Sequence, residues 1–348
     1  MAAHDGSSER EAARANTRLS RRAFVKGITG LGAAAVVGCS PSPARKLRRI
    51  GWLSGNASAS VKTLSQPFFQ ELADLGYVEG RDFIPVFRIA DNDNTKLPAM
   101  AAELAAMPVD ILIAEAQQAQ AAAKAATETI PIVFVLAADP VGEGLVSSIG
   151  RPGGNITGVR TGSELASGKR VERLKQAVPS LSSVAVVWNA KQPAMSRTLV
   201  QPTVNAARTL RMQPRVLGVE NEAQLNAALD VIAREGLESL VLGPALSVAP
   251  GKFNLVPDFA AQLKIPQIYA DEDMVRKGGG LMCFNSNRAA QYQRAAEFVD
   301  KIWRGTRPAD IPVEEPIEID FIVNLAAAKR IGLPFPTSVL RLATEIMP

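Results

Sequence analysis

Apolar runs of strand length alternate with helix-length segments from Arg49 onward, and this alternation restricts the chain to α/β folds. Several runs are continuously apolar, as is typical of parallel strands that helices cover on both faces. The segment Glu222–Glu235 has a helical period, because Leu225, Leu229 and Ile232 are spaced by four and three residues. The predicted strands are Ile50–Leu53, Phe83–Ile89, Asp110–Ala114, Ile130–Leu136, Val184–Trp188, Arg215–Val219, Ser239–Leu242, Gln267–Tyr269 and Gly280–Phe284.

Nine predicted strands favour two sheets over one, and a length of 348 residues suggests about two domains. The alternation is interrupted at "RPGGNITGV", Arg151–Val159, where a proline and paired glycines are typical of a turn or linker. We therefore predict two doubly wound lobes, each built on a parallel sheet.

The N-terminal segment predicts an export signal. Residues Ser20–Lys26 read SRRAFVK, which closely matches a twin-arginine signal with Arg21 and Arg22 as the pair. The apolar stretch that follows, Gly27–Gly38, is too short to cross a bilayer, which requires about 20 residues. It ends in VVGC, which resembles a lipobox with Cys39 as the lipidated residue. We assign residues 1–38 to the signal and 39–47, with its Pro/Ser run, to a tether.

Removal of that signal changes the charge and the chemistry of the chain. Taking six of 39 basic and three of 34 acidic side chains away reduces the net charge from +5 to +2, which gives no basis for nucleic-acid binding. The single histidine, His4, is lost as well, and with it imidazole acid–base chemistry and His-ligated zinc. Only Cys283 would remain free, so no intrachain disulfide is expected.

Near-matches to phosphate and metal motifs are better interpreted as structural. In "GEGLVS", Gly142–Ser147, a serine replaces the third glycine of a dinucleotide motif, and "GSELASGK", Gly162–Lys169, has the wrong glycine spacing for a P-loop. The acids Asp271–Asp273 are typical of a helix start. We predict no cofactor, no metal site and no catalytic residues; Cys283 ends an apolar strand and is expected to be a core residue.

Short polar residues follow the predicted strands. In open α/β sheets, ligands bind beyond the carboxyl ends of the strands, so these residues are candidates for a small-molecule site. Each alone is also typical of an ordinary turn or helix cap. The candidate ligand-binding residues are Ser54, Asn56, Gln117, Gln118, Asp139, Asn189, Asp271, Phe284 and Asn285.

Several longer segments resemble the ABC-transporter substrate-binding proteins related to tryptophan and tyrosine uptake, and the resemblance covers nearly everything from Arg48 on. The block IPIVF…DPVG…RPGGNITG is the most specific of them. The segments are Leu72–Phe83, Pro98–Ala114, Ala126–Val159, Gly278–Phe284 and Arg307–Leu333.

The resemblance implies the type I periplasmic-binding fold, in which two doubly wound lobes are joined by three crossings and close around a ligand. It implies lobe 1 at residues 48–156 plus 285–315 and lobe 2 at 157–284 plus 316–348. "GGNITG" then becomes the first crossing.

It also implies roles for the candidate residues. Gln117, Gln118 and the helix N–H groups behind them would hold a carboxylate. Asp139 would meet an ammonium or hydroxyl group, and Phe284 and Asn285 would close from the other lobe. The chain departs from the family at two places. The family often has a small residue and then Ser or Thr where this chain has Gln117-Gln118, and Ser-Tyr-Gly where this chain has Cys283-Phe284-Asn285. For this reason the resemblance does not identify tryptophan itself as the ligand.

We expect a periplasmic or otherwise extracytoplasmic lipoprotein, anchored through Cys39, that binds an amino-acid-like or aromatic carboxylate compound and delivers it to an ABC permease and ATPase. One alternative is a ligand sensor that presents its closed form to a membrane receptor or kinase. A cytoplasmic repressor of the same fold would need an N-terminal helix-turn-helix, and an enzyme would need a nucleophile motif; the sequence offers neither.

Overall fold

The computed structural model describes residues 47–191, 199–243, 252–315 and 318–348. The export signal and Cys39 lie outside these residues, so their predicted roles stay predictions. The described residues belong to one compact unit, Arg45–Pro348. None of the helices among them is both long enough and apolar enough to span a bilayer.

The first sheet has five strands in the order β2-β1-β3-β4-β5, and every pairing is parallel. This order places β1 and β3 side by side at the centre, where the direction of winding reverses. The strands are β1 (Arg48–Ser54), β2 (Phe83–Ile89), β3 (Ile111–Glu115), β4 (Ile132–Ala137) and β5 (Ile156–Arg160).

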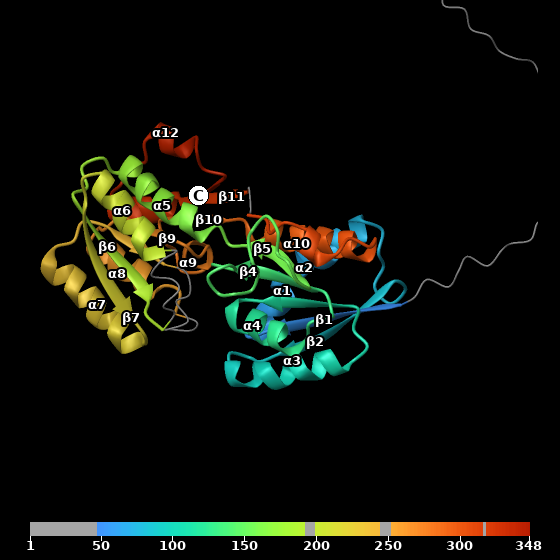
Figure 1. Ribbon diagram of the computed structural model, residues 1–348. Coiled ribbons are helices and arrows are strands. Elements are labelled where there is room, and N and C mark those ends of the chain that lie inside the picture. The colour runs from blue at the N-terminus through green and yellow to red at the C-terminus, as the bar shows by residue number, and fades with distance from the viewer. Residues whose placement is uncertain (1–46, 192–198, 244–251, 316–317) are drawn as a thin grey trace, which may run out of the picture. The chain divides into compact units, whose positions relative to one another are not determined.

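Helices cover both faces of this sheet because successive side chains of a strand point to opposite faces. In β1, Ile50 and Trp52 pack on one side and Leu53 on the other. The first side is covered by α1 (Ser58–Leu64), α2 (Gln66–Asp74) and α10 (Arg288–Trp303), and the second by α3 (Leu97–Ala106) and α4 (Gln117–Ala126). Figure 1 shows the orange α10 beside the blue α2, far from it in sequence.

The second sheet has seven strands in the order β12-β11-β10-β9-β8-β6-β7. Its strands are parallel from β7 through β10, whereas β11 runs antiparallel to β10 and β12 is parallel to β11. The strands are β6 (Ser183–Asn189), β7 (Gln213–Val219), β8 (Leu240–Leu242), β9 (Gln267–Tyr269), β10 (Met282–Ser286), β11 (Ile319–Asn324) and β12 (Glu345–Met347).

This sheet is also covered on both faces. The helices α5 (Ser163–Ala177), α6 (Gln201–Thr209), α11 (Leu325–Ile331) and α12 (Thr337–Leu340) enclose one hydrophobic cluster, and α7 (Glu222–Glu235), α8 (Leu255–Gln262) and α9 (Asp273–Arg276) enclose another. Single 3-10 turns lie at Asn94–Lys96 and Pro308–Asp310.

The predicted fold class is confirmed: each of the predicted strands is present, in two doubly wound sheets. Three further strands, β5, β11 and β12, had not been predicted. One part of the prediction is corrected, since the antiparallel β11 makes the second sheet mixed. The first sheet also extends to Arg160, four residues beyond the boundary predicted at residue 156, because β5 pairs with β4.

Three segments of chain pass between the two sheets side by side. The first follows β5 at Thr161 and not at "GGNITG", part of which lies in β5; the second follows β10 at Asn287, and the third precedes β11 at Glu318. The Ser286 hydroxyl donates to the carbonyl oxygen of Thr161 at 2.5 Å, which joins the first and second crossings. The Asn287 N–H donates to the carbonyl oxygen of Glu318 at 3.0 Å, which joins the second and third. The Arg160 N–H donates to the carbonyl oxygen of Glu314, so the first and third are also linked.

Candidate functional site

The reversal point of the five-stranded sheet brings two of the polar strand ends together. Ser54, the last residue of β1, lies opposite Glu115, the last residue of β3, in the parallel register. Helices leave these two strands on opposite faces of the sheet, and in open α/β sheets ligands bind beyond the carboxyl ends at such a point. Both side chains are fully buried.

Glu115 is the centre of a buried hydrogen-bond network. Its Oε1 accepts from Asn56 Nδ2 at 2.8 Å and from the Tyr292 hydroxyl at 2.6 Å, and its Oε2 lies 3.4 Å from the donor Nε1 of Trp52. Burial, the charge of Glu115 and the hydrogen bond to it raise the pKa of Tyr292 well above its ordinary value. The phenol therefore stays protonated and donating at neutral pH.

Four of the predicted ligand residues hold turns at strand ends. Ser54 Oγ accepts from the Asn56 N–H at 3.1 Å, and Asp139 Oδ1 accepts from the Gly142 N–H at 2.9 Å. Asn189 Oδ1 accepts from the Lys191 N–H and Asp271 Oδ1 from the Asp273 N–H, each at 3.0 Å. These local bonds are the ordinary turn role of such side chains. Their ligand contacts stay predictions.

Gln117 and Gln118 are the first two residues of α4, which begins directly after β3. The helix has no side-chain cap at this end. The N–H groups of a first turn have no partner inside the helix, and they carry a partial positive charge. Gln117 is half-buried and Gln118 is exposed. This helix start is therefore suited to a carboxylate.

The backbone is strained where two of these strands end. Ala116, which precedes α4, has φ 69° and ψ 161°, and Leu136, at a bulge near the end of β4, has φ 67°. Residues with a Cβ rarely adopt such angles, and the conformation of Ala116 is one that essentially only glycine populates. Strain of this kind concentrates at functional sites, so it supports a site at this edge of the sheet.

We expect Ala116→Gly to raise the free energy of unfolding by about 1 kcal/mol. Relief of the strain, of order 1–3 kcal/mol, exceeds the added backbone entropy of the unfolded chain, about 0.4–1 kcal/mol. Urea unfolding measures the change. The matched control is Ala121→Gly in the exposed interior of α4, which should lose about 1 kcal/mol. Equal losses in both variants would show that Ala116 is not strained.

Phe284 lies inside the core of the seven-stranded sheet. Its side chain is 7% exposed, meets Phe321 edge to face at 5.8 Å, and has the Arg173 guanidinium 5.5 Å from its ring centre. A stacking role would require the ring to leave these partners, because alternation along β10 turns it towards α5. The next residue, Asn285, is half-buried at the carboxyl end of the strand.

The buried Arg170 of α5 holds this strand end. Its Nε donates to the Phe284 carbonyl oxygen at 2.7 Å, Nη1 to Ser167 Oγ at 3.1 Å, and Nη2 to Asn285 Oδ1 at 3.2 Å. Burial lowers the pKa of Arg170 to about 10, so it is still a cation at neutral pH. In the described part of the chain it has no carboxylate partner.

No group of three or more acids, cysteines or histidines that could hold a metal occurs among the described residues. Cys283 is buried on β10, and burial raises the pKa of its thiol to about 12. It stays a neutral thiol at physiological pH and packs in the core.

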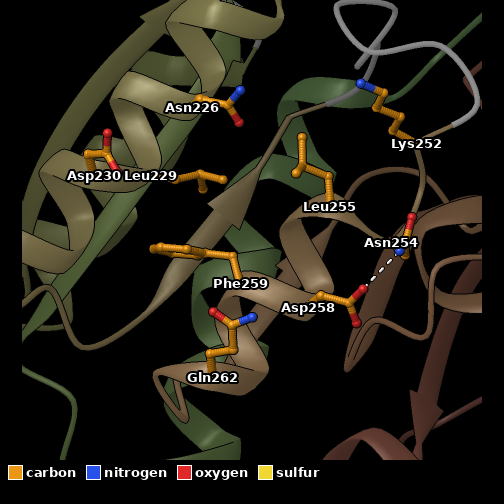
Figure 2. Close-up of a pocket in the computed structure, with 9 residues that line it drawn as sticks. All are labelled: Asn226, Leu229, Asp230, Lys252, Asn254, Leu255, Asp258, Phe259 and Gln262. Carbon is orange, nitrogen blue, oxygen red and sulfur yellow. Dashed lines mark hydrogen bonds between the residues drawn. The ribbon is translucent and has the colours of Figure 1, made fainter.

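A hollow of about 540 Å³ lies elsewhere, between α7 and α8 on the seven-stranded sheet (Figure 2). Leu229, Leu255 and Phe259 line it, and Asp258 at its edge accepts from Asn254 at 2.8 Å. Asp258 also accepts from Arg330. None of the strand-end residues lines this hollow, so it is separate from the candidate site.

The structure thus brings Ser54, Asn56 and the start of α4 to one sheet edge, and places Asn285 beside Arg170 on the other sheet. Sequence reasoning missed Tyr292 and Arg170 as supports of the site. The charge of Arg170 within an otherwise apolar helix stripe, between Ala166 and Leu174, was a signal that could have identified it.

Three comparisons relate the chain to known proteins. Residues 57–347 match the family model described as ABC transporter substrate binding protein. A tyrosine-binding protein of Clostridioides difficile (strain R20291) is 25% identical over 315 residues, which are 87% of this chain and 90% of that protein. Two solved structures share the fold, each at a TM-score of 0.77. A conserved domain protein from Vibrio cholerae is 24% identical and covers 86% of this chain and 100% of its own. An ABC domain in complex with L-Trp from Streptococcus pneumoniae is 22% identical and covers 87% of this chain and 100% of its own.

Proposed function

The chain belongs to the ABC transporter substrate-binding protein family, and from this premise we propose that its ligand is an aromatic amino acid held between the two sheets. The family binds a molecule for transport, which agrees with the expectation that the protein is not an enzyme. The observation that carries the proposal is the relationship, over nearly the whole chain, to a tyrosine-binding protein. The L-Trp complex of a protein with the same fold supports the same ligand class.

The strand-end geometry fits such a ligand. The uncapped start of α4 suits an α-carboxylate, and Gln117 and Gln118 lie at that start. We propose that Asp139, which lies two residues beyond β4, meets the ammonium or a hydroxyl group of the ligand. The three adjacent crossings between the sheets are suited to act as a hinge, because a few residues there can absorb a change in backbone angles.

Binding measurements test the ligand class. We expect L-tyrosine or L-tryptophan to raise the melting temperature of the purified protein, and a ligand at 100 times its Kd adds about 2.7 kcal/mol of stability. Glycine and D-glucose are the controls, since neither has an aromatic side chain and glucose lacks the zwitterion. A shift with glucose, or none with either aromatic amino acid, would contradict the proposal.

We also propose twin-arginine export through Arg21 and Arg22 and a lipid on Cys39, on the sequence motifs alone. Metabolic labelling with palmitate tests the anchor: the wild type should be labelled and Cys39→Ala should not. Partners would then be the permease and ATPase of the importer, with the protein held at a membrane outside the cytoplasm.

A further inference from the structure

Two asparagine side chains at strand ends have one end of the amide fixed by a buried charge. Asn56 follows β1 of the five-stranded sheet, and Asn285 lies in β10 of the seven-stranded sheet. Each is half-buried, so its other end can reach a ligand. The charges that hold the two amides have opposite signs.

Glu115 fixes the amide of Asn56. The carboxylate is fully buried and accepts from Asn56 Nδ2 at 2.8 Å. The same carboxylate oxygen also accepts from the Tyr292 hydroxyl, so the nitrogen end of the Asn56 amide, and not its oxygen, faces it. The remaining end of Asn56 is the oxygen, which has no hydrogen-bond partner among the described residues.

Arg170 fixes the amide of Asn285 in the opposite sense. Its guanidinium is fully buried and its Nη2 lies 3.2 Å from Asn285 Oδ1. A guanidinium can only donate, so the amide oxygen must face it. The remaining end of Asn285 is the nitrogen, to which the structure gives no acceptor within its described part.

We propose that Glu115 and Arg170 are positioning residues that set opposite polarities at the two amides, so that Asn56 presents an acceptor and Asn285 a donor to the ligand. This inference rests on the proposed function. An acceptor at Asn56 suits the ammonium group of an amino acid, and a donor at Asn285 suits its carboxylate. Asn56 on the five-stranded sheet then contacts the ammonium group, and Asn285 on the seven-stranded sheet gives the carboxylate a donor in addition to the start of α4. A molecule lacking either end of the zwitterion loses the contact to one of the two amides.

A test without ligand uses the side-chain NH2 signals of Asn56 and Asn285 in NMR spectra of the free protein. We expect an Asn56 proton to exchange slowly with water, because it is bonded to a buried carboxylate, and the Asn285 protons to exchange as in a free amide. Glu115→Gln should remove the protection of Asn56. Protected Asn285 protons beside unprotected Asn56 protons would overturn the inference whatever the ligand is.

A second test uses L-tyrosine, L-tyrosinamide and 3-(4-hydroxyphenyl)propanoate. We expect Asn285→Asp to weaken L-tyrosine about tenfold or more, because it replaces the donor by an anion, yet to leave L-tyrosinamide within about twofold. Glu115→Gln should weaken L-tyrosine about tenfold and the propanoate, which has no ammonium group, far less. Equal losses for all three compounds would indicate a merely structural role.

The controls are Glu103→Gln and Asn254→Asp, the same chemical changes at exposed positions away from both amides. Neither should alter any of the three affinities. If wild-type protein bound no L-tyrosine while the exchange pattern held, the ligand class would be wrong and the amide polarities would stand.

Discussion

Trp52→Ala is expected to lower the free energy of unfolding by about 4 kcal/mol, as for other buried aromatic residues replaced by alanine. Trp52 is fully buried and contacts four aromatic rings. The nearest ring centroid, that of Phe68, is 5.2 Å away, and the farthest, that of Tyr292, is 6.2 Å away. The change also removes the indole donor that faces Glu115. Urea unfolding of the purified protein measures the loss.

Trp188→Ala is the matched control. Trp188 also lies near the end of a strand, in the other sheet, but it is only half-buried against a small cluster around Leu199. We expect the free energy of unfolding to fall by about 1–2 kcal/mol, because truncation of this half-buried side chain removes less buried apolar area. If Trp52→Ala kept the stability within 1 kcal/mol and abolished binding, its ring would belong to the ligand site and not to the core.

Gly158→Ala is expected to cost about 3 kcal/mol, at the upper end of the range for overpacking. Gly158 lies in β5, and a Cβ added to it would be 2.1 Å from the carbonyl oxygen of Phe134 in β4. Backbone in the middle of a paired strand cannot yield as a flexible side chain does, so the two strands must separate. Thermal or urea unfolding measures the effect.

Gly154→Ala supplies the contrast within the same "GGNITG" segment. No atom lies within 4 Å of a Cβ added at Gly154, and its backbone is not in the left-handed region. The substitution should therefore change stability by less than about 0.5 kcal/mol. Similar losses in both variants would mean that strand contact is not the reason for glycine at position 158.

The strands that could be predicted are mostly those with continuous apolar runs, such as Ile132–Ala137. A strand that is buried on both faces is apolar throughout, and this pattern can be recognised without knowing which strands it pairs with. Two of the three strands that sequence reasoning missed, β5 and β12, lack that signal, whereas β11 has a short apolar run at Phe321, Ile322 and Val323. β5 contains Thr157 and Gly158 and follows a proline and two glycines, so it resembled a linker. β11 and β12 lie in the C-terminal segment, and the antiparallel pairing of β11 with β10 depends on where the third crossing returns the chain.

The candidate site was predictable to a similar extent. Strand-end position identified Ser54, Asn56 and Asn285 as candidates, since polar residues after apolar runs collect at one sheet edge. It could not show which of them are held by buried charges. Tyr292 reaches Glu115 across 177 positions of sequence, and Arg170 reaches Asn285 across 115.

The sequence by itself determined the α/β class, the two sheets, the family resemblance and the absence of histidine from the body of the chain, because these depend on local periodicity and residue content. Only the tertiary structure decided that the Phe284 ring is in the core, that Ala116 is strained, and that Asn56 and Asn285 have opposite amide polarities. Which face of a strand is buried, which backbone angles are strained and which end of an amide is bonded all depend on which distant residues meet. The packing of the helices on each sheet brings those residues together.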